Sequence, residues 1–217
     1  MKIKHNCLYI CLFVICLIIS NNTVAEGNRY GDSRNYHSEI SAAKAYLLTN
    51  HDQGNVTKSA FSNAVIIDVR TVEEYRAGHP PKAFNIPFPH IQSRPNKPDY
   101  IKQEPQDFVN AVLSAFPDRN TPIFTLCQTG KRSIGAANLL AAEGYINVRN
   151  IWQGFGGRTK TDVNGSVLDL NNNGVIDGIN GTDPGDRDGW SGYQELPVHT
   201  KLLPKLIYEP YQYLYYQ

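Results

Sequence analysis

Cys127 is the residue of this sequence best suited to covalent chemistry, and it stands in the segment CQTGKRS at 127–133. An apolar run at 122–126 leads into the segment, and a helical pattern at 131–143 follows it. A tight loop in this place turns backbone N–H groups inward, and the helix adds its positive N-terminal end, so the centre of the loop attracts an anion. We expect that anion to be the Cys127 thiolate, the nucleophilic form of cysteine.

The neighbours of Cys127 have types that suit an anionic substrate. Gly130 lets the backbone turn where a side chain would clash. Arg132 offers a fixed positive charge with forked donors for an oxyanion, so we take Cys127 and Arg132 as the candidate catalytic residues. The rest of the candidate substrate-binding loop is Gln128, Thr129, Gly130, Lys131 and Ser133.

The elements around this loop are expected to alternate between strands and helices. The continuous β-branched run at 64–69 is typical of a buried parallel strand. Further short strands are predicted at 83–86, 122–126 and 148–152, and helices at 40–48 (capped by Ser41), 72–77, 106–116 and 131–143. This order predicts an α/β fold with a parallel β-sheet flanked by helices. Ligands of such sheets bind beyond the carboxyl ends of the strands, where Cys127 would lie.

Three motifs in order make the chain resemble the single-domain rhodaneses, a sulfurtransferase family. The early motif is IDVR at 67–70 with GHP at 78–80 and AFNIP at 83–87, the second is the cysteine loop at 127–133, and the late one is NIWQGF at 150–155. The resemblance spans about residues 40–198, without the insert at 156–189. It implies a rhodanese-like fold.

The resemblance also implies a reaction. Cys127 would accept sulfane sulfur from a small sulfur-containing anion such as thiosulfate, hold it as a persulfide, and pass it to an acceptor that the sequence does not identify, a thiol, cyanide or a protein. Arg132 would position the oxyanion of the donor. Asp68 and Arg70 would support the site, with Arg70 paired to a helix carboxylate such as Glu74. His79 would make a structural hydrogen bond, and no organic cofactor is implied.

Other functions on the same fold remain open. Phosphatases and arsenate reductases related to rhodaneses have five residues between cysteine and arginine, whereas this chain has four, 128–131, which favours sulfur over phosphate. Gln128 stands where the family often has Arg, and the pair at 81–82 (PK) replaces an apolar residue and Gly, which affects donor preference. The principal alternative is a non-catalytic, calcium-stabilised binding module of the cell envelope.

A second motif, DLNNNGVID at 169–177, resembles the calcium loops of EF-hand and dockerin proteins. Oxygen ligands at the first, third and fifth positions, a Gly at the sixth and a carbonyl at the seventh suit Ca²⁺. The candidate ligands are Asp169, Asn171, Asn173, the carbonyl of Val175, and Asp177. Asn180 replaces the carboxylate expected at the twelfth position, and a plain Asn/Gly turn is the alternative. We expect a structural ion here and no chemistry.

The N-terminus reads as a signal peptide over residues 1–25. Lys2 and Lys4 precede an uncharged apolar run at 7–19, and the small residue Ala25 ends the segment. The run is short for a bilayer span, although an uncleaved anchor is the alternative. Cleavage would leave Cys127 as the one cysteine of the original 4, without an internal disulfide partner. We expect an exported protein, most simply a periplasmic one, without membrane association after cleavage; sequons such as 55–57 would matter in a eukaryotic secretory route.

The remaining organisation follows from composition. With 41% hydrophobic residues, 19% charged residues, a net charge of +1 and no basic stripe, the chain suits one globular domain and not nucleic-acid binding. We expect a mobile leader at 26–38, the rhodanese-like domain at 39–200, and a Tyr-rich tail at 201–217 that covers the domain. Within the domain, the Pro-rich stretch at 87–105 is expected as a surface excursion and the Asn/Asp/Gly-rich segment at 156–189 as an insert outside the core.

Overall fold

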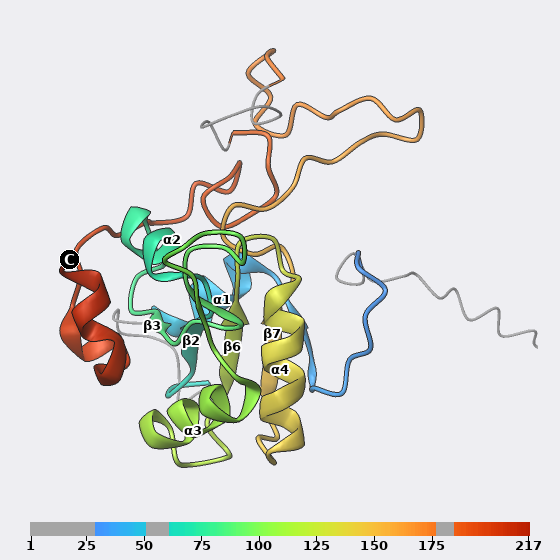
Figure 1. Ribbon diagram of the computed structural model, residues 1–217. Helices are drawn as coiled ribbons and strands as arrows, with labels where there is room; N and C mark the ends of the chain where they lie inside the picture. Colours follow the sequence, from blue (N-terminus) through green and yellow to red (C-terminus); the bar gives the residue numbers. More distant parts are fainter. Residues whose placement is uncertain (1–28, 51–60, 177–184) are drawn as a thin grey trace, which may run out of the picture.

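The computed structural model describes residues 29–50, 61–176 and 185–217, which form an α/β domain around a five-stranded sheet (Figure 1). All strand pairings in this sheet are parallel. The predicted fold class, a parallel sheet flanked by helices, is confirmed. In spatial order the strands are β1 (Ser38–Ile40), β7 (Val148–Ile151), β6 (Ile123–Leu126), β2 (Val65–Asp68) and β3 (Phe84–Asn85).

Helices cover both faces of the sheet (Figure 1). Helices α3 (Pro105–Ala115) and α4 (Arg132–Ala142) pack on the face that presents Ile67 and Ile123. Helices α1 (Ala42–Thr49) and α2 (Val72–Ala77) pack on the face that presents Ile66 and Phe124. Successive strand residues point to opposite faces, so strands with an apolar layer on each side must be apolar throughout. This explains the continuous apolar runs of β2 and β6.

Side-chain caps fix where the first two helices begin. Ser41 caps α1, and its hydroxyl accepts a hydrogen bond from the Lys44 amide at 3.2 Å, as predicted. Thr71 and Glu74 form a capping box at the start of α2. Helix α1 begins two residues later than the predicted helix because Ile40 is the last residue of β1 and pairs with Ile151 of β7.

The expected mobile leader at 26–38 makes specific contacts along its described part, 29–38. Tyr36 is buried, and the Tyr30 hydroxyl donates a hydrogen bond to the Thr129 carbonyl at 2.7 Å. The Asn35 amide donates to the Asn138 side chain at 2.8 Å. The segment therefore belongs to the packed domain and ends in β1, contrary to the expectation of a free leader.

The Pro-rich stretch is only partly a surface excursion. It contains the antiparallel ribbon of β4 (His90–Gln92) and β5 (Ile101–Lys102). Phe88 and Ile91 are buried, and the Phe88 ring lies 4.9 Å from that of Phe108 between centroids. The expectation of a surface excursion is wrong for Phe88 and Ile91, because these apolar side chains pack into the core, whereas the turn between β4 and β5 is exposed.

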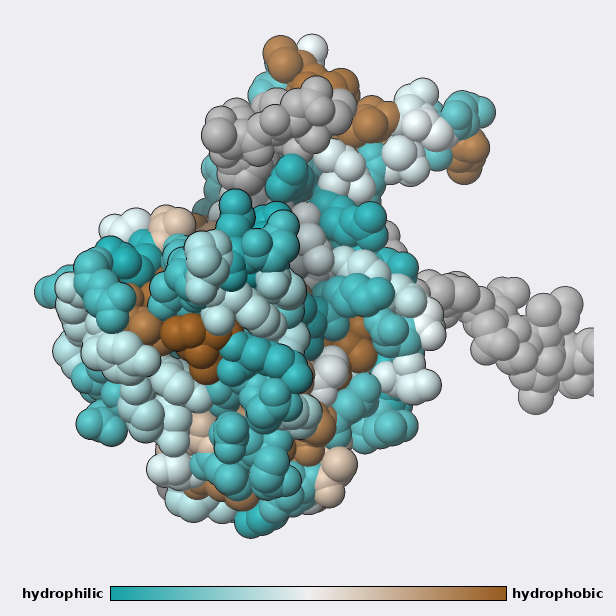
Figure 2. All heavy atoms as spheres, viewed as in Figure 1, coloured by the Kyte–Doolittle hydropathy of each residue, from teal (hydrophilic) through white to brown (hydrophobic). Residues whose placement is uncertain are grey.

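The segment at 156–189 divides into a projecting part and packed ends. Residues 158–176, orange in Figure 1, run outward from the domain, and Figure 2 shows brown apolar atoms on the projecting part. Asp186 and Asp188 are fully buried, however, and the backbones of Gly157 and Gly189 lie so close that a Cβ on Gly157 would meet the Gly189 nitrogen at 2.0 Å. The ends of the segment are therefore part of the core, contrary to expectation.

The C-terminal tail lies against the face formed by α2 and the end of β3. It consists of two short 3-10 helices, η2 (Pro204–Leu206) and η3 (Glu209–Tyr215). Leu214 and Tyr215 are buried while Tyr213 is 60% exposed, so one side of the tail packs. The Tyr215 hydroxyl donates a hydrogen bond to the Asn85 side chain.

Two observations concern the predicted export. The predicted signal peptide, 1–25, lies outside the described residues. Within the ranges that the structure does describe, no helix combines the length and apolar character that a bilayer crossing requires.

Candidate active site

Cys127 directly follows β6 and is 1% exposed. Its Sγ accepts hydrogen bonds from the Gly130 amide at 3.2 Å and from the Ser133 hydroxyl at 3.3 Å. Helix α4 begins at Arg132, so its positive end lies at the same loop. Two hydrogen-bond donors and a helix N-terminus are thus directed at this sulfur, an arrangement suited to an anion.

The loop is held from behind by the late motif at 150–155. Gly130 has φ +93°, and a Cβ there would lie 2.0 Å from the Trp152 carbonyl oxygen. Gly154, in the late motif, in turn lies close to the backbone of the cysteine loop, since a Cβ on Gly154 would lie 2.6 Å from the Thr129 amide nitrogen. The Phe155 amide donates to the Cys127 carbonyl at 2.7 Å. The glycines thus allow two backbone segments to pack without side chains between them.

Arg132 makes a bidentate ion pair with Glu74 of α2, with N–O distances of 2.8 and 2.7 Å. The Thr71 amide also donates to Glu74, at 2.9 Å. Burial opposes ionisation of Glu74, but the hydrogen bonds and charge of Arg132 outweigh it and lower the pKa of this carboxyl below its usual 4.5. The predicted oxyanion-binding fork of Arg132 is therefore already occupied by a carboxylate of the chain itself.

Arg70 pairs with Asp68 and not, as expected, with Glu74. Its Nη2 lies 2.7 Å from the Asp68 carboxylate and 2.7 Å from the Gly78 carbonyl oxygen, and both charged side chains are buried. The guanidinium carbon lies 3.8 Å from the centroid of the Phe155 ring. The expected pairing is wrong because Arg132, at the start of α4, reaches Glu74 instead. Asp68 and Arg70 support the loop without lining its cavity.

The other predicted loop residues are brought to the same place. Gln128 lines a cavity beside the loop, and its carbonyl accepts from the Gly156 amide at 2.9 Å. Thr129 is held by Tyr30, and the exposed Lys131 has its Nζ 5.5 Å from the centroid of the same ring. Ser133 is fully buried beside Cys127.

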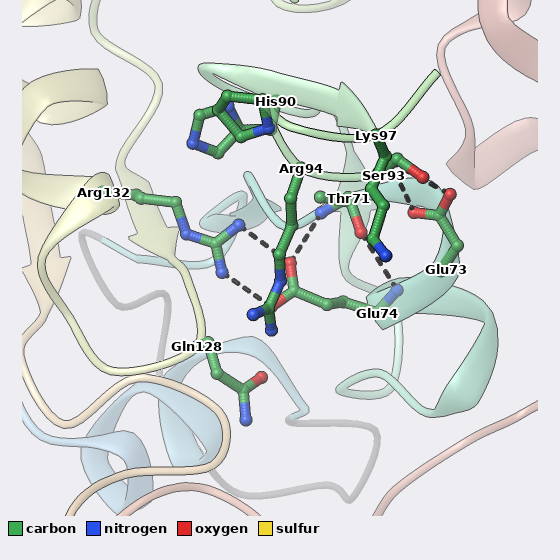
Figure 3. Close-up of a pocket in the computed structure, with 10 residues that line it drawn as sticks. Thr71, Glu73, Glu74, His90, Ser93, Arg94, Lys97, Gln128 and Arg132 are labelled. Atoms are coloured by element: carbon green, nitrogen blue, oxygen red, sulfur yellow. Dashed lines mark hydrogen bonds and ion pairs between the residues drawn. The ribbon is translucent and has the colours of Figure 1, made fainter. Parts of the chain in front are cut away.

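The cavity beside the loop has a volume of about 600 Å³ and brings together three parts of the chain (Figure 3). Thr71 and Glu74 come from the segment after β2, Gln128 and Arg132 from the cysteine loop, and further residues from the β4–β5 ribbon and its turn. This third group was not predicted from the sequence. No motif marks it, because only the folded ribbon places it beside the cysteine loop. Its members are His90, Ser93, Arg94, Pro95 and Lys97.

His79 has the structural role expected for it. It is buried, with Nδ1 3.0 Å from the Tyr75 carbonyl oxygen and its ring stacked on that of Tyr75 at 3.9 Å between centroids. Burial lowers the pKa of His79, so the neutral ring is favoured in the folded chain. Nothing in this arrangement directs His79 toward Cys127.

The predicted calcium loop lies in the projecting segment, apart from the cysteine loop (Figure 1). The Asp169 carboxylate accepts from the amides of Asn173 and Gly174 at 3.2 and 2.7 Å. The Asn171 side chain accepts from the Asn173 amide, and Val175 is exposed. Among the described residues no three His, Cys, Asp or Glu side chains come together to hold a metal ion. Asp177 lies outside the described residues, and the calcium site stays a prediction.

Cys127 thus lies buried in a loop at the carboxyl end of a central parallel strand, with one amide and one hydroxyl directed at its sulfur. The Rhodanese-like domain profile matches residues 44–159, just over half of the chain. The chain belongs to the rhodanese family, and its fold is rhodanese-like.

Similar chains are found among both curated proteins and solved structures. The uncharacterized protein RP600 of Rickettsia prowazekii is 36% identical over 101 residues, which cover 46% of this chain and 75% of that protein. Thiosulfate sulfurtransferase 18 of Arabidopsis thaliana is 30% identical over 117 residues, 54% of this chain and 73% of that protein. The crystal structure of Rv0390 from M. tuberculosis superposes with a TM-score of 0.47 at 22% identity, covering 76% of this chain and 99% of that one.

Proposed function

We propose that this protein is a sulfurtransferase that carries sulfane sulfur on Cys127. The observation that carries the proposal is the cradle of Cys127, whose Sγ lies within hydrogen-bond distance of the Gly130 amide and the Ser133 hydroxyl. Two donors at one sulfur can hold a persulfide anion in this place. Membership of the rhodanese family and the thiosulfate sulfurtransferase of Arabidopsis support the same chemistry.

The reaction runs in two displacements. The Cys127 thiolate attacks the outer sulfur of a donor such as thiosulfate, a new S–S bond forms, the donor's own S–S bond breaks, and sulfite leaves with the electron pair. An acceptor nucleophile, a thiolate, cyanide or a protein thiol, then attacks the terminal sulfur, and the electron pair returns to Cys127. No net oxidant is needed. The loop donors stabilise the sulfur anion at the start and end of the cycle.

Intact-protein mass spectrometry after incubation with thiosulfate tests the proposal. The reduced wild-type chain gains one sulfur atom, the gain is reversed by a thiol reductant, and Cys127→Ser gains nothing. Ser133→Ala is a second variant, which keeps the nucleophile but removes one donor, and gains sulfur more slowly. A folded, fully reduced wild type that gains no sulfur from thiosulfate or from other sulfane donors would overturn the proposal.

A non-catalytic binding module is the second candidate. Two observations favour it: Cys127 is almost fully buried, and the fork of Arg132 is occupied by Glu74. A chain that never takes up sulfur, yet retains a partner after Cys127→Ser, would be of this kind. The same mass spectrometry separates the two candidates.

Export and calcium binding complete the proposal. The charged and apolar pattern of residues 1–25 supports a cleaved signal and a periplasmic protein, and N-terminal sequencing of the mature chain from the periplasmic fraction would begin at Glu26. The ligand spacing at 169–177 supports one structural Ca²⁺ in the projecting segment. Native mass spectrometry in calcium, with and without chelator, would count that ion.

A further inference from the structure

The cavity beside the cysteine loop contains cations that the loop itself does not supply. Arg132 is committed to Glu74, so its forked donors do not face a second anion. The turn between β4 and β5 adds two further cations to the lining, Arg94 and Lys97. Figure 3 shows Arg94 extending from this turn into the cavity. These two side chains therefore offer an oxyanion in the cavity donors that Arg132 does not.

The turn that carries Arg94 is fixed in place. The Ser93 amide donates to the Glu73 carboxylate at 3.1 and 3.3 Å, which ties the turn to α2. The Ser93 hydroxyl donates to Asp99 at 2.6 Å, and the Lys97 amide donates to the Arg94 carbonyl at 2.9 Å. These bonds fix the backbone of the turn from which the two exposed cations extend. A fixed backbone lowers the entropic cost of binding an anion.

The cavity lining carries two carboxylates and three cations. Glu74 is paired with Arg132, whereas Glu73 accepts only the neutral Ser93 amide and keeps its charge. Neither Arg94 nor Lys97 forms an ion pair with any residue in the part of the chain that the structure describes. Burial, and then the charge of Arg132, lower the pKa of His90, so this ring adds no positive charge at neutral pH. The pKa of Asp99 is lowered by the hydrogen bond from Ser93 and, to a smaller extent, by the charge of Lys97. Arg94 is therefore the cation of the cavity that the described chain engages least, and the lining keeps an excess of one positive charge.

We propose that Arg94, supported by Lys97, binds the oxyanion end of the sulfur donor, while Arg132 holds the cysteine loop through Glu74. The inference rests on the proposed sulfur transfer and names its donor class: dianions with a sulfonate-like end, such as thiosulfate, in preference to neutral sulfane compounds. Forked guanidinium donors match such an end better than an ammonium does, so Arg94 is the principal ligand.

The test measures thiosulfate binding apart from sulfur transfer. Thiosulfate is titrated into the Cys127→Ser chain and binding is followed by NMR chemical shifts, with and without Arg94→Ala. Loss of one charged hydrogen-bonding group at an exposed site weakens binding roughly tenfold. Arg76→Ala, an exposed arginine of α2 outside the cavity, is the matched control and leaves the dissociation constant unchanged. Arg94→Lys restores part of the affinity.

Failure of the Arg94 anion site can be distinguished from failure of the proposed sulfur transfer. Equal dissociation constants for Arg94→Ala and Arg76→Ala, or no thiosulfate binding to the Cys127→Ser parent, would overturn the role of Arg94. Binding that depends on Arg94 in a protein whose wild type takes up no sulfur would leave the anion site standing and remove the sulfurtransferase. If the anion site and sulfur transfer are both present, Arg94→Ala raises the thiosulfate concentration needed for half-maximal persulfide formation. The maximal rate stays close to that of the wild type.

Discussion

At the scale of single residues, Gly130 shows how closely the cysteine loop is fitted. Its φ is +93°, and a Cβ added there would lie 2.0 Å from the Trp152 carbonyl oxygen, so no side chain has space at this position. We expect Gly130→Ala to destabilise the fold by about 3 kcal/mol, since backbone strain and a backbone clash add. Urea unfolding measures the loss, and persulfide formation falls with it because the Gly130 amide moves away from Cys127.

Gly165 provides the control for this substitution. It has φ +84°, but nothing lies within 4 Å of the position that a Cβ would take. Gly165→Ala therefore carries only the strain of a left-handed backbone, about 1 kcal/mol. Equal losses at the two positions would mean that the close approach to Trp152 does not constrain the loop.

The residues around Cys127 differ in how far sequence could predict them. The contacts of Cys127 with Gly130 and Ser133 lie within one loop, so residue types and spacing were sufficient. The partner of Glu74 was not predictable, because Arg70 and Arg132 are both arginines within reach of α2 in principle. The fold decides for Arg132, because the N-terminal ends of α2 and α4, on opposite faces, meet at the carboxyl edge of the sheet. Arg94 had no sequence signal at all, since it reaches the cavity through an irregular turn.

At the scale of elements, the Glu74–Arg132 pair joins the start of α2 to the start of α4. The two side chains are 30% and 22% exposed, so solvent screens the pair only in part. We expect Glu74→Gln to cost about 1 to 2 kcal/mol at pH 7, through the lost charge and a poorer capping box. Urea unfolding at several pH values measures it, and Glu104→Gln, which removes an exposed pair with Lys102, changes stability little.

The contribution of this ion pair to stability falls as the pH falls. The folded chain holds the pKa of Glu74 below the ordinary 4.5, because Arg132 stabilises the carboxylate by more than burial destabilises it. The unfolded chain thus takes up the proton first as pH falls, and the contribution of the pair, present above about pH 4.5, is lost below it. The stability difference between wild type and Glu74→Gln should shrink from pH 7 to pH 4. A constant difference would contradict the ion pair.

The main strands and helices were predictable because their apolar patterns are long or continuous. Strand β1 was missed, since of its three residues only Ile40 is buried and its pairing with β7 bridges more than a hundred positions. The β4–β5 ribbon was missed for a similar reason. Its prolines and charges indicate a loop, while Phe88 and Ile91 pack inward only because the folded domain offers them an apolar surface.

At the scale of the whole molecule, both ends of the described chain return to the sheet. The N-terminal segment adds β1 to the free edge of β7, and its Tyr30 reaches the cysteine loop at Thr129. The C-terminal tail closes the opposite side, against α2 and β3. From its tyrosines, the tail was predicted to cover the domain. The segment at 26–38 was predicted to be a mobile leader, because it carries few apolar side chains and its hydrogen bonds leave no pattern in the sequence.

Tyr215 tests whether the tail is part of the cooperative fold. Its side chain is 1% exposed, lies edge-on to the Tyr75 ring at 6.2 Å between centroids, and donates to Asn85. Tyr215→Ala should lower the free energy of unfolding by about 3 kcal/mol, since it leaves a cavity and removes the hydrogen bond to the side-chain oxygen of Asn85. Tyr213→Ala, in the same helix but 60% exposed, should change it by less than about 0.5 kcal/mol. Similar small losses in both variants would show that the tail unfolds independently of the domain, and a loss confined to Tyr215→Ala would show that it covers the sheet as one unit with it.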